Sequence, residues 1–297
     1  MHVAILSVRT GWHTDELLRA LASRGHTGAV VPYEATVARV GGTRTPTLSS
    51  QREQLLSADA VLARFIPNGS LEQIIYRVDA LHWLEDRGVR VMNSPRTIER
   101  CVDKFYTSAL LHEAGLATPE TIVCESADDA MAAVRELGDV IIKPLFGSMG
   151  HGMVRVSDPD TAFRVVRALE MTRAVFYVQR VIEHHGCDIR AFVVGDRVVA
   201  AMERRASDGG WRTNISRGGD ARAMELSPEW TELALRAARV VEADYVGVDL
   251  LPARDGTVHV LEVNGIPGWS GIQTVTETDI AGAIVDRLVD CASAGRG

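Results

Sequence analysis

The stretch Val246-Gly-Val-Asp-Leu-Leu-Pro-Ala-Arg-Asp-Gly-Thr-Val-His-Val-Leu-Glu-Val-Asn264 consists of two apolar runs joined by a turn at Asp255-Gly256. An Asp-Gly pair between apolar runs predicts a two-residue hairpin loop, because a type I′ turn needs a positive φ at both central positions. Counting back from this loop places Asp249 opposite Glu262. Pro252 or a β-bulge would shift this register by one residue.

Three oxygen-bearing side chains meet on this hairpin. Opposed side chains of an antiparallel pair have Cβ atoms roughly 4.5–5.5 Å apart, which brings Asp249 close to Glu262. Glu262 and Asn264 are two residues apart and therefore point to the same face of the strand. Hard oxygen ligands without imidazole or thiolate favour Mg²⁺, which often shares its shell with phosphates. The alternative is a solvated acidic face, but both runs are too apolar for a half-exposed strand, and buried carboxylates need a cation.

The composition of the 297-residue chain is that of a globular protein, with 46% apolar and 24% charged residues. This length predicts two or three subdomains. The net charge of −7 argues against general nucleic-acid binding. No apolar run approaches the roughly 18 residues of a membrane span, and the N-terminus lacks the features of a signal peptide. We expect a cytoplasmic protein with reduced thiols, because four cysteines lack paired spacing: Cys101, Cys124, Cys187 and Cys291.

The N-terminal segment alternates apolar strands with helices, which is typical of an open α/β sheet. No G-x-G-x-x-G motif follows the first strand, so dinucleotide binding is not expected here. Arg64 ends a predicted strand, and open α/β sheets place ligands at the carboxyl ends of their strands. Arg64 is therefore a candidate substrate residue, although an arginine there can equally be solvated. The predicted strands span 3–8, 28–32 and 58–65, and the predicted helices span 15–24 and 71–88.

The stretch Val140-Ile-Ile-Lys-Pro-Leu-Phe-Gly-Ser-Met-Gly-His-Gly-Met-Val-Arg-Val156 holds a glycine-rich loop between two apolar runs. A P-loop or a Rossmann loop would run into a helix, whereas both runs here predict strands. Gly147, Gly150 and Gly152 allow backbone amides to close over phosphate oxygens. The alternative is a flexible hairpin without a ligand. Lys143 favours the phosphate site, because a cation under an amide-rich loop suits a polyphosphate.

Cationic and amide side chains accumulate shortly before the acidic hairpin, in the stretches Glu203-Arg-Arg205 and Arg212-Thr-Asn-Ile-Ser-Arg-Gly-Gly219, from which Arg205, Arg212 and Asn214 are the candidates. Cations beside a metal are what a site needs when negative charge builds on a transferring phosphoryl group. His184, His185 and Cys187 suggest a zinc cluster at first sight. They lack spaced partner pairs, and we interpret them as loop residues.

Several motifs occur in one order along the chain: Asp103-Lys104, Lys143-Pro144, the glycine-rich loop, Val178-Gln179, Gly186-Cys-Asp-Ile-Arg190, Arg212-Thr-Asn214, Gly247-Val-Asp249 and Glu262-Val-Asn264. This order resembles the ATP-grasp superfamily, and in particular the RimK-type α-L-glutamate ligases. The resemblance runs almost continuously from about residue 93 to residue 288 and is looser before residue 90.

The resemblance implies an ATP-grasp fold of the α/β (α+β) class, in which two α+β subdomains clamp ATP. The expected parts are an N-terminal pre-ATP-grasp α/β domain over 1–95, a central subdomain with the glycine-rich loop over 96–182, and a C-terminal subdomain with the Mg²⁺ site over 183–297. The implied cofactors are ATP and Mg²⁺, with two ions expected and Mn²⁺ able to substitute.

The resemblance also implies roles for individual residues. The residues expected to bind ATP are Lys104, Lys143, Gly147, Ser148, Gly150, Gly152, Gln179, Arg180, Val181, Asp188 and Arg212. Among these, the segment 179–181 would hold the adenine and Asp188 would lie near the ribose. The metal ligands would be Asp249, Glu262 and Asn264, in agreement with the hairpin argument. The catalytic candidates are Arg205, Arg212 and Asn214, and the substrate candidates are Arg64, Arg190, Arg205 and Ser270.

The chain departs from the family pattern at two places. Arg180 stands where RimK-like chains usually carry Glu, which leaves backbone contacts to hold the adenine. Trp269 and Ser270 differ from the commonest RimK version, in a segment that borders the acceptor site.

The implied reaction is the ADP-forming ligation of a carboxylate to an amine through an acyl phosphate. The amine is expected to be an amino acid, L-glutamate, and the acceptor a small molecule or a coenzyme. The first segment resembles RimK-like ligases of C1-coenzyme pathways such as tetrahydromethanopterin. One alternative is a ligase that modifies a ribosomal protein tail or a carrier protein, although the net charge of −7 disfavours a strongly acidic partner. Another is a non-enzymatic ATP-binding module, which would be expected to lack a metal ligand or a phosphate lysine. We also expect a homo-oligomer.

Overall fold

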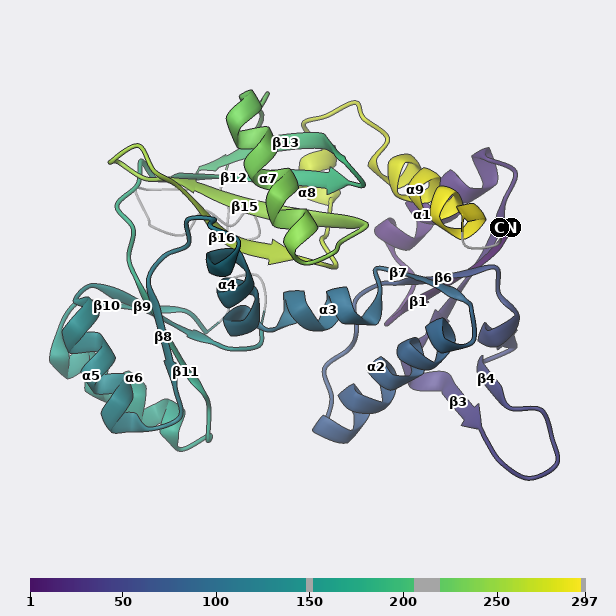
Figure 1. The fold of residues 1–297 in the computed structure, drawn as a ribbon, viewed down its shortest axis with the longest axis horizontal. Helices are drawn as coiled ribbons and strands as arrows, with labels where there is room; N and C mark the ends of the chain where they lie inside the picture. Colours follow the sequence, from purple (N-terminus) through teal and green to yellow (C-terminus); the bar gives the residue numbers. More distant parts are fainter. Residues whose placement is uncertain (148–151, 206–219, 295–297) are drawn as a thin grey trace.

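The computed structural model describes residues 1–147, 152–205 and 220–294. Within these ranges the strands form four sheets. Figure 1 shows the N-terminal sheet and the central sheet toward opposite ends of the molecule, with the C-terminal sheet along the top between them. None of the described helices combines the length and the apolar character that crossing a membrane requires.

The N-terminal domain contains a parallel sheet of order β2-β1-β6-β7, which confirms the predicted open α/β sheet. A small antiparallel sheet, β3-β4-β5, follows β2 and was not predicted. The helix α2 begins with a capping box, in which the Ser70 side chain accepts from the Gln73 amide. The bounds are β1 (His2–Ser7), α1 (Trp12–Ser23), β2 (Thr27–Pro32), β3 (Thr36–Arg39), β4 (Thr47–Ser50), β5 (Glu53–Gln54), β6 (Ala60–Ala63), α2 (Leu71–Asp86) and β7 (Arg90–Met92).

The central part consists of an antiparallel sheet of order β10-β9-β11-β8 with α5 and α6 packed on one face. β9 pairs with β10, so the glycine-rich segment joins two strands, as predicted. The helices α3 and α4 connect this part to the N-terminal domain (Figure 1). The bounds are α3 (Pro95–Val102), α4 (Lys104–Glu113), β8 (Thr121–Cys124), α5 (Ala127–Leu137), β9 (Val140–Pro144), β10 (Val154–Val156), α6 (Pro159–Glu170) and β11 (Phe176–Arg180).

The C-terminal sheet is antiparallel, with the order β14-β13-β12-β15-β16. One face packs against α7 through aliphatic side chains such as Val248 and Ala237. The opposite face carries a row across three strands, because Arg190 is paired with Asp249 and Asp249 with Glu262. The bounds are β12 (Cys187–Val194), β13 (Arg197–Arg205), β14 (Asp220–Ala223), α7 (Pro228–Val240), β15 (Tyr245–Pro252), β16 (Val258–Asn264), α8 (Ser270–Gln273) and α9 (Ile280–Ala294).

The pairing of Asp249 with Glu262 is confirmed, but the loop prediction was wrong. The Ala253 amide donates to the Thr257 carbonyl at 2.8 Å, so the loop holds three residues instead of two. Within it only Gly256 has a positive φ, of 90°. A register shift between Asp249 and Leu250 then restores the predicted pairing, because the extra loop residue and the bulge compensate each other.

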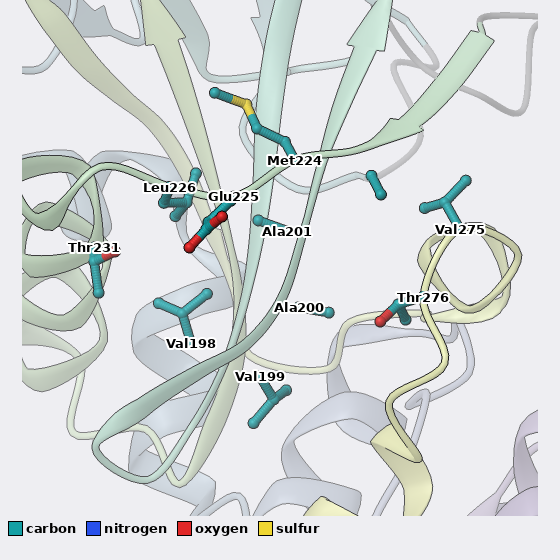
Figure 2. A pocket seen from close by; sticks show the side chains of 11 residues that line it. Val198, Val199, Ala200, Ala201, Met224, Glu225, Leu226, Thr231, Val275 and Thr276 are labelled. Carbon is teal, nitrogen blue, oxygen red and sulfur yellow. The ribbon is translucent and has the colours of Figure 1, made fainter.

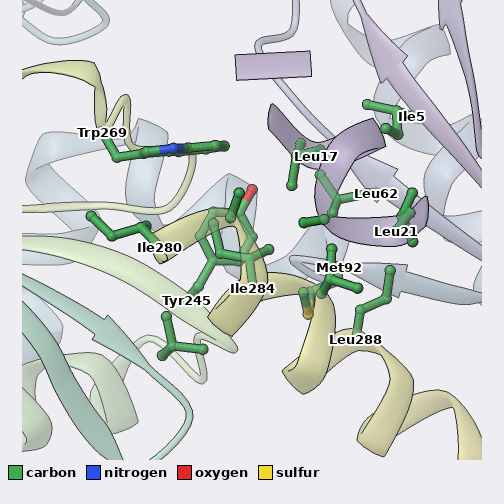
Figure 3. Close-up of a cluster of buried hydrophobic side chains, with 14 of the residues drawn as sticks. Ile5, Leu17, Leu21, Leu62, Met92, Tyr245, Trp269, Ile280, Ile284 and Leu288 are labelled. Atoms are coloured by element: carbon green, nitrogen blue, oxygen red, sulfur yellow. The ribbon is translucent and has the colours of Figure 1, made fainter. Parts of the chain in front are cut away.

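The first and last parts of the chain share one hydrophobic core. Leu17 of α1 and Ile5 of β1 pack in the same cluster as Trp269 and Ile284, which lie more than 250 residues away in the sequence. Figure 3 shows side chains from the N-terminal domain and from α9 meeting around Tyr245. The helix α9 therefore completes the N-terminal domain while belonging in sequence to the C-terminal part.

Candidate functional site

The only two lysines of the chain interact with the same carboxylate. Lys104 begins α4 and Lys143 lies on β9. Burial lowers the pKa of Lys143 to about 8, an effect that Glu262 opposes and Lys104 reinforces. Burial also lowers the pKa of Lys104, again against the field of Glu262. The two predicted phosphate lysines thus lie within electrostatic reach of a predicted metal ligand on another sheet.

Hydrogen bonds hold both ammonium groups in place. Lys143 Nζ donates to Gln179 Oε1 at 2.6 Å. Lys104 Nζ donates to the carbonyl oxygen of Gly147 at 2.7 Å and to that of Leu145 at 3.2 Å. Lys104 thereby ties the start of α4 to the segment that enters the glycine-rich loop.

The two described ends of the glycine-rich loop require glycine. Gly147 has a φ of 144° and Gly152 a φ of 74°, which L side chains rarely adopt. A Cβ at these positions would meet the ring of Pro144 at 3.4 Å and 3.3 Å. Four predicted site residues lie outside the described residues, and their roles stay predictions: Ser148, Gly150, Arg212 and Asn214.

Glu262 and Asn264 lie on the face of β16 opposite to Val263, which is buried in the core beneath α7. The Ile266 amide donates to Asn264 Oδ1 at 3.0 Å. Within the described part of the chain, the Glu262 carboxylate forms no hydrogen bond or ion pair. None of the described residues therefore competes with a cation for its oxygens.

Asp249 is buried between two arginines. Arg190 donates to both carboxylate oxygens at 2.7 Å, and Arg204 lies 2.9 Å from Oδ2. Arg204 also donates to both oxygens of Asp188, at 2.7 and 2.6 Å. Burial raises the pKa of Asp249, but Arg190 and Arg204 outweigh it and lower the pKa to about 2. Asp249 is therefore an anion at neutral pH.

The donor set of Asp249, Glu262 and Asn264 fits a magnesium ion. A carboxylate offers about four lone-pair sites, and the arginine contacts of Asp249 use three of them. Two carboxylates and one amide oxygen are the kind of partial shell that Mg²⁺ completes with water and phosphate. Arg190 and Asp188 serve the network around Asp249 in this structure, and their predicted contacts with substrate and ribose stay predictions.

Arg204 is the residue that sequence analysis missed. Arg205 was predicted instead, but its side chain is exposed and forms an ion pair with Glu203 at 2.8 Å. Neighbouring residues of a strand point to opposite faces, and Met202 and Arg204 are both buried. Arg204 therefore replaces Arg205 as the candidate, and the alternation along β13 was the signal that identified it.

Arg64 is buried against the C-terminal part of the chain, and its role in substrate binding stays a prediction. Its side chain is 5% exposed and donates to the hydroxyl of Tyr245 and the carbonyl of Pro267, both at 3.2 Å. Its guanidinium lies 4.7 Å from the ring centroid of Trp269. Arg64 was predicted correctly to follow the end of a strand, but the C-terminal part of the chain covers that end. Ser270, the other predicted residue of this region, is exposed at the start of α8.

The predicted adenine segment, residues 179–181, forms hydrogen bonds and an ion pair with neighbouring elements of the central part. Gln179 is buried and bonded to Lys143. The Arg180 side chain forms an ion pair with Glu120 at 2.7 Å and donates to the Leu137 carbonyl at 2.8 Å. Arg180 is thereby engaged with neighbouring elements, and the roles of residues 179–181 in nucleotide binding stay predictions.

A groove of about 540 Å³ lies elsewhere, between β13, the segment after β14, α7 and residues 275–276 (Figure 2). Its described lining is mainly aliphatic, with Glu225 as the charged residue. None of the predicted site residues in the described ranges lines it. We therefore place the candidate site at the two lysines and the acidic hairpin, because the predicted phosphate and metal ligands lie there.

Two family models together match nearly the whole chain. Residues 101–288 match the RimK-like ATP-grasp domain, and residues 1–98 match the RimK PreATP-grasp domain. Tetrahydromethanopterin:alpha-L-glutamate ligase of Methanosarcina acetivorans is 35% identical over 88% of this chain and 90% of that protein. A probable alpha-L-glutamate ligase of Chromohalobacter salexigens is 35% identical over 100% of this chain and 97% of that protein.

Solved structures share the fold. The ATP-grasp ligase PsnB complexed with its minimal precursor has a TM-score of 0.75 at 23% identity, covering 97% of this chain and 98% of that chain. A RimK domain protein ATP-grasp from Sphaerobacter thermophilus has a TM-score of 0.73 at 25% identity, covering 97% and 100%. These matches confirm the resemblance that the motifs indicated and the predicted ATP-grasp fold.

Proposed function

Because this chain belongs to the RimK-like ATP-grasp family of ligases, we propose that it couples L-glutamate to the carboxylate of a small-molecule acceptor, with ATP converted to ADP and phosphate. The observation that supports this proposal best is that Lys104 and Lys143 both lie within electrostatic reach of Glu262. Two cations and an anionic metal ligand form a suitable frame for a polyphosphate and its Mg²⁺. Asp249, Glu262 and Asn264 would hold Mg²⁺, and the bound ion would neutralise phosphate charge.

The main contribution of the protein to this reaction would be to position the reacting groups. A carboxylate is a poor acyl donor, and transfer of the γ-phosphoryl group to it creates a good leaving group. The lysines would align the phosphate oxygens and offset their charge. The amine then attacks the acyl carbon, phosphate leaves, and Arg212 or backbone amides are candidates to offset the oxyanion charge. No covalent enzyme intermediate is needed.

The acceptor is proposed from the relatives. Tetrahydromethanopterin:alpha-L-glutamate ligases of two archaeal species, at 35% and 31% identity, support a coenzyme-like carboxylate. We propose a C1 carrier of this type as the first acceptor to test. A peptide acceptor is the alternative, because PsnB has been solved with the precursor peptide PsnA2.

The proposed reaction predicts that hydroxylamine will trap an acyl hydroxamate. The experiment supplies Mg-ATP, hydroxylamine and one carboxylate at a time, from a panel that includes glutamate-tailed pterins and acidic peptides. We expect hydroxamate and ADP in equal amounts with the true acceptor and little ADP without it, because the site must keep water from the acyl phosphate. Arg212→Ala is expected to lose trapping while still binding ATP. Rapid ATP hydrolysis that no carboxylate or amine changes would instead indicate an ATPase or a nucleotide-binding module.

The pKa of Lys143 predicts how nucleotide use depends on pH. The pKa is lowered from 10.5 to about 8, so the ammonium loses its proton as the pH rises through about 8. Because the charged form binds phosphate, kcat/KM for ATP is expected to fall above that pH. Lys143→Ala should raise the KM for ATP and lower kcat at every pH.

Lys143→Arg is the matched control, since arginine stays charged across this range. Its kcat/KM is expected to lose the alkaline decrease even where its maximum value is reduced. An unchanged alkaline limb in Lys143→Arg would show that another group titrates.

A further inference from the structure

The loop Gly265–Trp269, which follows the candidate metal ligands directly, is held by the N-terminal part of the chain. Asn93 Nδ2 donates to the Gly265 carbonyl at 2.6 Å. Arg64 donates to the Pro267 carbonyl at 3.2 Å, and the Trp269 amide donates to His13 Nε2 at 3.0 Å. Three side chains from separate positions in the N-terminal part thus bind three alternate residues of one loop.

The same loop orients a candidate metal ligand. Its second residue, Ile266, donates its amide to Asn264 Oδ1 at 3.0 Å. This bond occupies one lone pair of the carboxamide oxygen and fixes which way the other points. The loop also lies against β15, where a Cβ on Gly247 would be 3.1 Å from Pro267 Cβ. A shift of the loop would therefore move the Asn264 oxygen.

The anchoring groups are arranged to hold the loop in one position. Trp269 is fully buried, with the Arg64 guanidinium over its ring and the His13 ring edge-on at 4.6 Å. Burial and the nearby charge of Arg64 lower the pKa of His13 to about 4. His13 is therefore neutral at physiological pH, and its Nε2 is free to accept the Trp269 amide hydrogen. Protonation of Nε2 would remove that acceptor.

We propose that His13 and Arg64 are positioning residues for the magnesium site, acting through the loop 265–269 on Asn264. The proposal rests on the proposed function for the metal itself. Groups that orient metal ligands are worth about 10- to 100-fold in metal affinity or activity. The N-terminal domain would thus contribute to metal binding without contributing a ligand.

The first experiment measures the loop directly by amide hydrogen exchange. His13→Ala is expected to accelerate exchange of the amides of Ile266, Gly268 and Trp269, while exchange in 246–251 stays as in the wild type. His13→Gln should restore protection, because its Oε1 can accept a hydrogen bond where Nε2 does. Unchanged exchange of these three amides in His13→Ala would overturn the proposal, whatever the enzyme activity.

The second experiment measures metal binding, with Mn²⁺ and ADP as the probe, by electron paramagnetic resonance. His13→Ala is expected to weaken Mn²⁺ binding in the presence of ADP by about 10-fold. Its affinity for ADP without metal should equal that of the wild type. His13→Gln should bind Mn²⁺ as tightly as the wild type does. His82→Ala is the matched control, because the exposed His82 of α2 contacts Glu99 of α3 and not the loop. Arg64→Met provides a second variant and should weaken Mn²⁺ binding in the same way.

The outcomes separate the two proposals. If the wild type binds no Mn²⁺ with ADP, the proposed function fails, and hydrogen exchange alone then decides whether the loop is anchored. If the wild type binds Mn²⁺ and both His13→Ala and Arg64→Met bind it equally well, the positioning role is wrong. Equal losses of ADP affinity and Mn²⁺ affinity would also contradict it, because they would indicate general destabilisation.

Discussion

Arg204→Met is expected to lower the free energy of unfolding by about 3–5 kcal/mol, the cost of removing one partner from a buried ion pair. Arg204 is 4% exposed and binds two buried carboxylates, those of Asp188 and Asp249. Without it, Asp188 keeps no charged partner among the described residues, and Asp249 keeps only Arg190. Urea unfolding followed by circular dichroism measures the change.

Arg205→Met is the matched control on the neighbouring residue. Arg205 is exposed and pairs only with Glu203 in the described structure, and such surface pairs contribute little to stability, so Arg205→Met is expected to unfold like the wild type. The two variants remove the same charge and differ only in the face of β13 from which it is removed. Equal stabilities would contradict the buried network.

Glu262→Gln is expected to reduce ADP formation by about 100- to 1,000-fold, the range for losing one electrostatic contribution to a transition state. Glutamine keeps the shape of the side chain but removes the charge that would bind Mg²⁺ and that offsets Lys104 and Lys143. The pKa of Lys143 should fall further in this variant, because Glu262 raises it in the wild type.

The rate of ADP release at saturating Mg-ATP and acceptor checks this expectation. Glu225→Gln serves as control, because Glu225 lines the groove of Figure 2 and lies outside the candidate site. A wild-type rate in Glu262→Gln would remove Glu262 from the magnesium site. A thermal unfolding temperature close to that of the wild type would show that the fold is intact.

The acidic hairpin shows why pattern reasoning succeeded where it did. Asp249 and Glu262 were paired correctly because the apolar alternation constrains which residues share a face. The loop between them was assigned one residue too short, because Asp-Gly suits both a two-residue loop and a three-residue loop with a single positive φ. The longer loop and the bulge each shift the register by one residue in opposite directions, so the pairing of Asp249 with Glu262 is unchanged.

Other features depend on contacts between distant segments and could not be predicted. Arg64 was expected to face a ligand, but the loop around Pro267 and Trp269 covers it. Nothing in the local sequence indicates which surface another domain will cover. The alternation of buried and exposed residues along β13 would have distinguished Arg204 from Arg205. The contact of His13 with the Trp269 amide, in contrast, has no signature in the local sequence.

The rarity of lysine in this chain is a compositional signal for the candidate phosphate site. The chain has 32 basic residues, and only Lys104 and Lys143 among them are lysines. Arginine thus serves the surface ion pairs, while the two lysines lie at the candidate phosphate site. The lysine ammonium is a compact point charge on a flexible stem, with three donors that can rotate toward phosphate oxygens, whereas the guanidinium of arginine is a rigid planar fork.

The core shared by the two ends of the chain affects how the protein is made. Residues 1–92 leave the ribosome long before α9 is synthesised, yet Ile5 and Leu17 belong to the same buried cluster as Ile284 and Leu288 of that helix. The N-terminal domain therefore emerges with part of its apolar surface uncovered, and this surface is completed by Trp269 and α9. The central sheet, whose core lies within residues 122–178, depends on no later segment. During translation the middle of the chain can reach its final packing first, and the nascent N-terminal domain is the part with most need of a chaperone.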